Sequence, residues 1–154
     1  MTFKDFVARG GHWVLAQTVL LIAALWIPLE TGAKAPFDLR WLGAGLAALG
    51  LGFATIAMLG LRQTLTPFPK PRDRGVLQTR GPYSLVRHPI YSGMILSSFG
   101  WSLHQASSEG LLMSLVLGVF FDRKATYEER WLVEKYPDYA EYRKRVRKLV
   151  PGVY

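Results

Sequence analysis

Residues 41–61, WLGAGLAALGLGFATIAMLGL, run between Arg40 and Arg62 without one charged side chain. A helix needs about 20 apolar residues to cross the hydrocarbon core of a bilayer. Further apolar runs flank this one at 10–29, 88–108 and 110–121. The pattern predicts an all-α polytopic membrane protein with about four transmembrane helices. The predicted spans are about 12–29, 41–61, 89–104 and 110–124 of a single domain that covers 1–154.

The composition agrees with this class. Of the 154 residues, 50% are hydrophobic and 19% are charged, and the mean hydropathy is +0.14. A soluble domain carries about 25% charged residues. Three long uncharged runs leave this chain too few polar residues to cover the surface of a soluble domain. The sequence holds no Cys, which excludes a disulfide scaffold, a thiolate zinc site and a cysteine nucleophile within it.

The basic residues predict the orientation. The chain has 19 Lys and Arg; all but Lys34 and Arg40, which leaves 17, lie before the first span, between the second and third, or after the fourth. The positive-inside rule therefore predicts that both termini and the loop at 64–88 are cytoplasmic. The formal charge of +8 then reflects topology and attraction to anionic lipids. We expect membrane lipids as partners and no nucleic acid.

Small residues recur four positions apart within 41–61. Such residues let two helix backbones approach closely, where lipid supplies no hydrophobic drive for association. The sequence therefore predicts close helix packing through the pairs Gly43/Ala47, Ala44/Ala48 and Gly50/Ala54.

The loop before the third span ends in RGPYSLVRHPIYSG, residues 80–93. Pro89 suits the first turn of a helix, because its missing N–H would have no partner there. Arg87 and His88 then stand at a helix N-terminus, which attracts a carboxylate or phosphate. The alternatives are a topological charge at Arg87 and an interfacial or capping role for His88. No His lies at metal-ligand spacing from another, so we expect no metal.

A second group of polar residues follows the fourth apolar run, in FFDRKATYEERWLVEKY at 120–136. No helix breaker occurs before Pro137, so Glu128 and Glu129 lie on a helix that leaves the membrane. The simpler alternative is a solvated amphipathic helix with Tyr127, Trp131 and Leu132 packed on its partner. A separate alternative for Arg123 is a structural pair with Asp122. The residues after it, YAEYRKRVRKLVP, are basic and amphipathic, and we expect a helical tail over 125–150 that lies along the inner leaflet.

The order of these motifs over 64–151 resembles one family. RHPxYxG followed at this distance by EExxL is similar to the isoprenylcysteine carboxyl methyltransferase and phosphatidylethanolamine N-methyltransferase superfamily of integral membrane enzymes. The resemblance implies S-adenosyl-L-methionine as cofactor, enclosed by the cytoplasmic helix ends and covered by the loop at 64–88, in which 75–78 line the pocket. It implies cofactor contacts from Gln78, Tyr83, His88, Pro89, Tyr91, Glu128 and Glu129, and the chemistry of the cofactor's carboxylate adds Arg87.

The residues expected to contact the methyl acceptor follow from the same resemblance. Arg123 or Lys124 stands where the family has its substrate-facing arginine, and we expect Arg123 in that role. Glu128 or His88 would take the proton of an amine or thiol acceptor, whereas a carboxylate needs no base. The predicted function is methyl transfer to a lipophilic or small acceptor at the cytoplasmic interface. The alternatives are a non-catalytic membrane scaffold and a membrane reductase with a nicotinamide cofactor.

Overall fold

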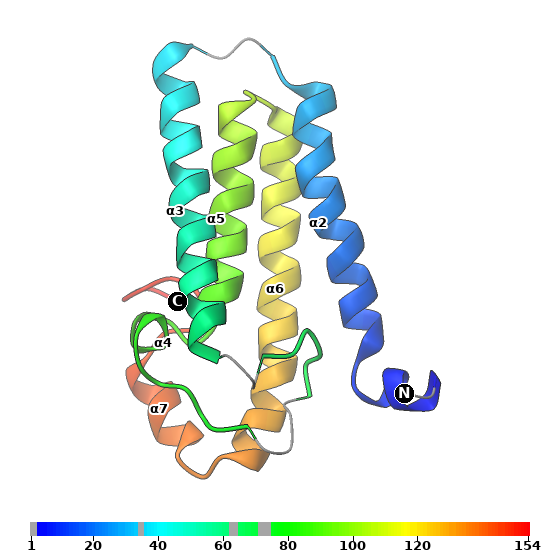
Figure 1. The fold of residues 1–154 in the computed structure, drawn as a ribbon, viewed down its shortest axis with the longest axis vertical. Helices are drawn as coiled ribbons and strands as arrows, with labels where there is room; N and C mark the ends of the chain where they lie inside the picture. The colour runs from blue at the N-terminus through cyan, green and yellow to red at the C-terminus, as the bar shows by residue number, and fades with distance from the viewer. Residues whose placement is uncertain (1–2, 34–35, 62–64, 71–74) are drawn as a thin grey trace.

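The computed structural model describes residues 3–33, 36–61, 65–70 and 75–154. In that part of the chain the regular elements are helices, which confirms the all-α class. Four long helices run side by side (Figure 1): α2 (Gly11–Thr31), α3 (Phe37–Leu61), α5 (Pro89–His104) and α6 (Ser108–Lys135). Three short helices gather at their lower end: α1 (Phe3–Ala8), α4 (Pro82–Leu85) and α7 (Tyr139–Arg145).

Two of these helices are long and apolar enough to cross a membrane, α2 and α3. Many of their large apolar side chains point away from the protein; Leu15, Trp26, Leu49 and Leu59 are among the exposed ones. An apolar surface of this extent is expected to face lipid rather than water. The helix α5 begins at Pro89, as the sequence predicts, with His88 at its N-cap position.

The helices α3 and α5 pack with their backbones almost in contact. A Cβ atom added to Gly50 would lie 2.5 Å from the carbonyl oxygen of Gly93, and one added to Gly43 would lie 2.7 Å from that of Gly100. Gly43, Gly50 and Ala54 are buried on this face, which confirms the predicted role of the small residues. The pair Ala44/Ala48 does not share it, because Ala48 is exposed.

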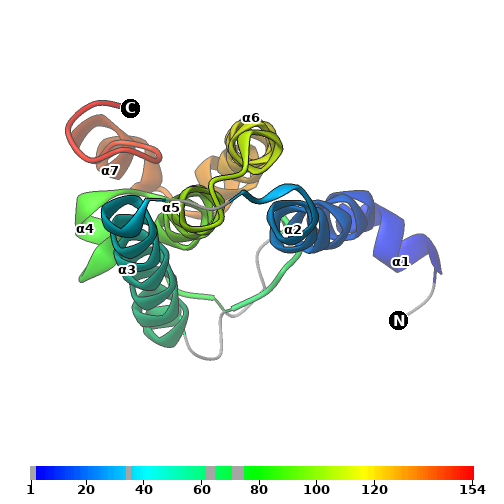
Figure 2. The same ribbon diagram turned by 90° about the horizontal axis from the view of Figure 1, so that it is seen from above.

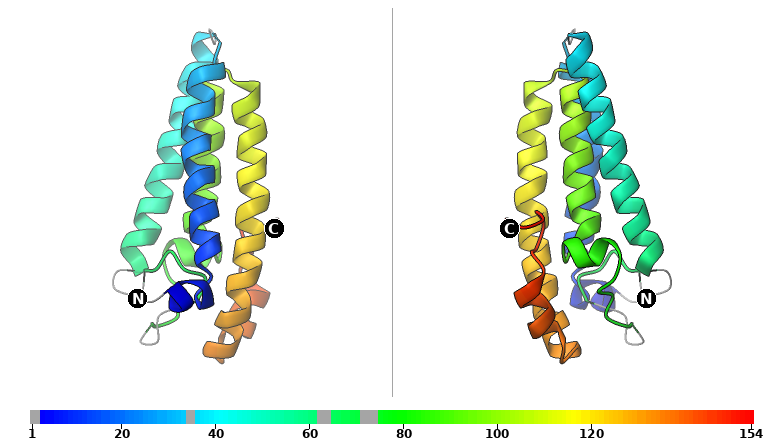
Figure 3. Two further views of the ribbon diagram at one scale, coloured as in Figure 1. Left: turned by 90° about the vertical axis from the view of Figure 1, so that its right-hand side faces the viewer. Right: turned by 90° about the vertical axis from the view of Figure 1, so that its left-hand side faces the viewer.

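The helix α6 completes the bundle beside α5 and α2, and Figure 2 shows α2 and α3 on opposite sides of α5. Its apolar core contains Leu117 and Phe121, both fully buried, together with Ala24 of α2. Hydroxyl groups link the helices as well: Ser98 and Ser114 lie 2.8 Å apart, oxygen to oxygen. Figure 3 shows α6 continuing past the lower ends of the other long helices, as the absence of a breaker predicts.

The residues after α6 differ from the prediction of a helical tail to 150. The helix α7 ends at Arg145, and its Tyr139 and Tyr142 are buried against the protein. From 146 onward the chain runs back to the start of α5, where Val86 and Arg147 form a parallel β-bridge. The first N–H groups of a helix have no partner within it, and the returning chain supplies carbonyl oxygens next to them.

Candidate active site

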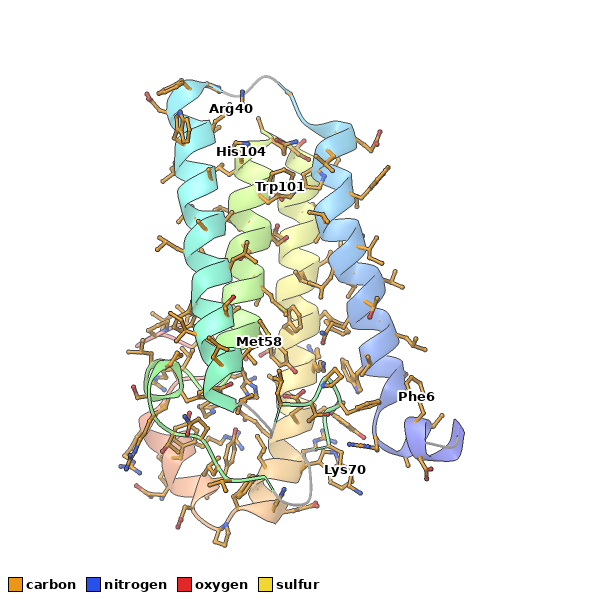
Figure 4. All side chains as sticks on the ribbon, in the orientation of Figure 1. Phe6, Arg40, Met58, Lys70, Trp101 and His104 are labelled. Carbon is orange, nitrogen blue, oxygen red and sulfur yellow. The ribbon has the colours of Figure 1, made fainter. Side chains whose placement is uncertain are left out.

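A cavity of about 310 Å³ lies at the lower end of the bundle. Its walls come from α2, α3, α5 and α6, from the segments 65–69 and 75–78, and from α4 and α7. Met58 marks its upper wall on α3 (Figure 4). Segments from α2 to α7 therefore meet here, at the boundary between the apolar bundle and the charged lower end.

Most of the sequence-predicted residues line this cavity. Those that do so are Gln78, Tyr83, Arg87, His88, Pro89, Tyr91 and Glu128, together with Gly75, Val76 and Leu77. Glu129 is outside the lining and contacts Arg87 and His88 from behind. Arg123 is exposed on α6 and is also outside the lining.

Glu129 holds the residues at the start of α5. Its carboxylate accepts a hydrogen bond from Arg87 Nε at 2.7 Å, and it lies 3.2 Å from His88 Nε2. Arg87 also donates to the backbone carbonyl oxygens of Arg143 and Val146. Burial alone would raise the pKa of Glu129, but hydrogen bonds from His88 and Arg87 and their charges outweigh it and lower the pKa to about 2. Glu129 is therefore a fixed anion.

Glu128 has a different environment, although it is the next residue. Tyr91 donates a hydrogen bond to its carboxylate, and His88 Nδ1 lies 3.6 Å from the other carboxylate oxygen. Burial raises the pKa of Glu128, and the charges of His88 and Lys124 with the Tyr91 hydrogen bond offset this only in part. Adjacent carboxyl groups with pKa values shifted in opposite directions are typical of an acid–base site.

Lys124 is a buried cation of α6 that lines the cavity. Its side chain is 1% exposed, and its ammonium donates to Gln17 of α2 and to the carbonyl oxygen of Pro67 at 3.0 Å. The ammonium also lies 4.0 Å from Glu128 and 5.3 Å from the centre of the Tyr91 ring. Successive residues of a helix point about 100° apart, and here Lys124 points into the cavity whereas Arg123 is exposed outside it.

Several lining residues were not singled out from the sequence. They are Gln17, Met58, Met94, Tyr136, Tyr139 and Tyr142, whereas the lining segment 65–69 belongs to the predicted cofactor loop 64–88. Gln17 could have been identified from the sequence, because it is an amide within the apolar run 10–29. A polar group at membrane depth usually marks a functional site. Nothing in the sequence distinguishes the three tyrosines, because aromatic residues on an amphipathic helix are usually packing residues. Within the described residues, no group of three or more metal-ligating side chains occurs.

Curated relatives resemble most of this chain. The cobalt-zinc-cadmium resistance protein CzcN of Cupriavidus metallidurans is 26% identical over 93% of the chain and 63% of its own length. Methanethiol S-methyltransferase of Pseudomonas deceptionensis is 28% identical over 92% and 58%. Protein-S-isoprenylcysteine O-methyltransferase of Schizosaccharomyces pombe is 34% identical over 70% and 47%. The chain thus spans about half to two thirds of the length of these relatives.

A family model agrees with these relatives and covers the site. The model described as phospholipid methyltransferase matches residues 39–139. This range is well over half of the chain, and it includes Arg87, His88, Glu128 and Glu129. The match confirms the resemblance that the RHPxYxG and EExxL motifs indicate. The chain belongs to the phospholipid methyltransferase family.

Proposed function

We propose that this protein is an S-adenosylmethionine-dependent methyltransferase that acts on a lipophilic or small acceptor at the cytoplasmic face of a membrane. The observation that carries the proposal is the cavity between α5 and α6, where Glu128 meets Tyr91, His88 and Lys124. Family membership supports it, as do the names of two of the three relatives, which are methyltransferases for methanethiol and for isoprenylcysteine.

The residues of the cavity fit the cofactor. S-adenosylmethionine carries a carboxylate, an ammonium, a sulfonium and an adenine, and a cavity of about 310 Å³ lies at the lower end of the usual range for small-molecule sites. Glu128 suits the ammonium or a ribose hydroxyl, and the rings of Tyr83 and Tyr91 suit adenine or the sulfonium through stacking and cation–π contacts. When bound, this cofactor supplies a methyl group that its sulfonium has already activated.

The protein's contribution is therefore positioning and proton transfer. Glu129 orients Arg87 and His88, and because it remains ionised it holds them throughout the reaction. Glu128, with its raised pKa, is the candidate base for an amine or thiol acceptor, since a base works best when its pKa approaches the working pH. An acceptor carboxylate would need no base, and then Glu128 only binds.

We assign the acceptor-facing cation to Lys124 rather than Arg123. A buried cation is stable only beside anions or hydrogen-bond acceptors. The Lys124 ammonium donates to two neutral acceptors, on Gln17 and Pro67, and lies 4.0 Å from Glu128. Its charge can therefore also pair with an anionic group of the substrate. Met58, Leu61 and Met94 also line the cavity, and their apolar side chains suit an acceptor that enters from the bilayer.

The proposal includes the membrane topology. We infer that α5 and the upper part of α6 cross the membrane beside α2 and α3, which gives four spans with both ends of the chain in the cytoplasm. Support comes from the side-by-side arrangement of the four long helices (Figures 1 and 2) and from the 17 basic residues that this topology places on the cytoplasmic side of the membrane.

A thermal-shift experiment on the detergent-purified protein tests the function. S-adenosylhomocysteine should raise the melting temperature, because a ligand stabilises the folded state that binds it, whereas NADPH should not. The variant Glu128→Gln should lose affinity by roughly 10–100-fold, the equivalent of about 1.5–3 kcal/mol for a hydrogen bond to a charged group. A shift with NADPH alone would support a reductase, and no shift with either ligand would support a scaffold.

A further inference from the structure

The chain after α7 contacts the start of α5 through its backbone. Residues 146–149, here called the tail segment, lie beside 86–92. Arg87 N donates to the carbonyl oxygen of Arg147 at 2.8 Å, and His88 N donates to that of Lys148 at 3.1 Å. Ser92 Oγ donates to the carbonyl oxygen of Leu149 at 2.6 Å, and Leu149 is buried. The tail segment thus binds the backbone N–H groups of Arg87 and His88, the two residues whose side chains contact Glu129.

The same segment contacts α6 through one side chain. Lys148 Nζ donates to Asp122 Oδ1 at 2.7 Å and to Thr126 Oγ1 at 3.0 Å. The hydroxyl of Tyr154 also lies within hydrogen-bond distance of both Lys148 and Asp122. Asp122 pairs with Lys148 here, at variance with the sequence-based alternative in which Asp122 neutralises Arg123.

These contacts connect the two helices that carry the site. Tyr91 reaches across from α5 to Glu128 on α6, and His88 reaches across to Glu129. On α6, Asp122 lies nearly two helical turns before Glu128, and Thr126 lies less than one turn before it. A displacement of about 1 Å between reacting groups can slow an enzyme about a hundredfold, so a link between these two helices at this level has a direct effect on the site.

We propose that Lys148 is a positioning residue: its pair with Asp122 fixes the start of α5 against α6 and so sets the distances between His88, Tyr91 and the two glutamates. The inference rests on the proposed methyl-transfer function. The tail segment lies beyond residue 139, where the family match ends, so the match itself assigns it no role. Partly exposed ion pairs contribute little to stability, and the pair's contribution here is geometric.

The variant Lys148→Met tests the proposal, because it removes the charge and keeps most of the side-chain length. Lys144→Met is the matched control: Lys144 pairs with Glu141 at 3.1 Å on the surface of α7, and both side chains are exposed. In Lys148→Met the amide hydrogens of Arg87 and His88 should exchange on the order of tenfold faster. Turnover should fall by roughly ten- to a hundredfold, and Lys148→Arg should restore both. Lys144→Met should change neither.

Two results would overturn the proposal. One is unchanged exchange at Arg87 and His88 in Lys148→Met; the other is a fall in turnover that only follows the fraction of folded protein, as the melting temperature would report. Amide exchange needs no cofactor, so it tests the link between the helices even if S-adenosylhomocysteine fails to bind the wild-type protein. That failure would reject the proposed function and leave the exchange result intact.

Discussion

Tyr91 on α5 donates its hydroxyl hydrogen to the carboxylate of Glu128 on α6. Its ring stacks on Phe121, with 4.5 Å between the ring centres, and lies parallel to the His88 ring at 5.6 Å. The apolar core of the bundle therefore fixes the orientation of a ring that contacts the site. Packing between the helices and acid–base chemistry are coupled through this one residue.

Removal of the Tyr91 hydroxyl should shift the pH dependence of the reaction. The hydrogen bond lowers the pKa of Glu128 and so opposes the effect of burial. In Tyr91→Phe the pKa of Glu128 should rise further, and the acidic limb of the profile of kcat/KM against pH should move to higher pH. An unchanged acidic limb, with an acceptor that must lose a proton, would exclude Glu128 as the base.

The two glutamates should differ in their effects on stability. The pKa of Glu129 is lowered to about 2 from an ordinary 4.5, so its ionised form stabilises the fold above about pH 4.5, and this contribution is lost as the pH falls toward 2. Glu129→Gln should lower the melting temperature at pH 7 and weaken its dependence on pH in that window. The pKa of Glu128 is raised, which has the opposite sign, so Glu128→Gln should leave the melting temperature at pH 7 unchanged or higher. Thermal unfolding between pH 7 and pH 2 measures both; a greater loss in Glu128→Gln would contradict the assignment.

Lys124 and Arg123 form a matched pair of neighbouring cations. Lys124→Met should impair turnover while the affinity for S-adenosylhomocysteine stays within about threefold of wild type, a change of roughly 0.7 kcal/mol. Arg123→Met should keep normal specific activity, because Arg123 is exposed and outside the cavity. The reverse result would return the acceptor-facing role to Arg123.

The glycines of α3 offer a test of the helix packing. Gly50→Ala should destabilise the protein by about 1–3 kcal/mol, as other overpacked sites do, because the new Cβ would lie 2.5 Å from a backbone oxygen of α5. Gly45→Ala is the control: no other atom lies within 4 Å of a Cβ built there, and alanine favours the helix by about 1 kcal/mol. Equal melting temperatures for the two variants would argue against the close approach of α3 and α5.

Reporter fusions test the topology. A reporter inserted at Ala35 and one fused after Tyr154 should lie on opposite sides of the membrane, because Lys34 and Arg40 are the basic residues expected outside the cytoplasm. Both reporters on one side would contradict the assignment of four spans.

The sequence alone indicated the class of the protein and many of the residues that line its cavity. Uncharged runs near 20 residues leave a chain few alternatives to apolar helices, and small residues at intervals of four indicated the tight face of α3. Pro89 marked the start of α5 because proline is favoured in the first turn of a helix and costs a hydrogen bond at later positions. The RHPxYxG and EExxL motifs supplied Arg87, His88, Tyr91 and Glu128, which line the cavity, and Glu129 behind them.

Tertiary structure alone decided how these components are used. A helical pattern gives the spacing of side chains but leaves free the rotation of one helix against another, so only the packing of α6 selected Lys124 over Arg123 for the cavity. The same packing gave Glu128 and Glu129 opposite pKa shifts, because each glutamate meets partners about forty positions away in the sequence. Residues 139–151 have a basic amphipathic pattern typical of a helix on a membrane surface, yet the tail segment is not helical, because its carbonyl oxygens accept hydrogen bonds from the backbone N–H groups of Arg87 and His88. Local sequence cannot encode that choice, since the hydrogen-bonding partner lies on another helix.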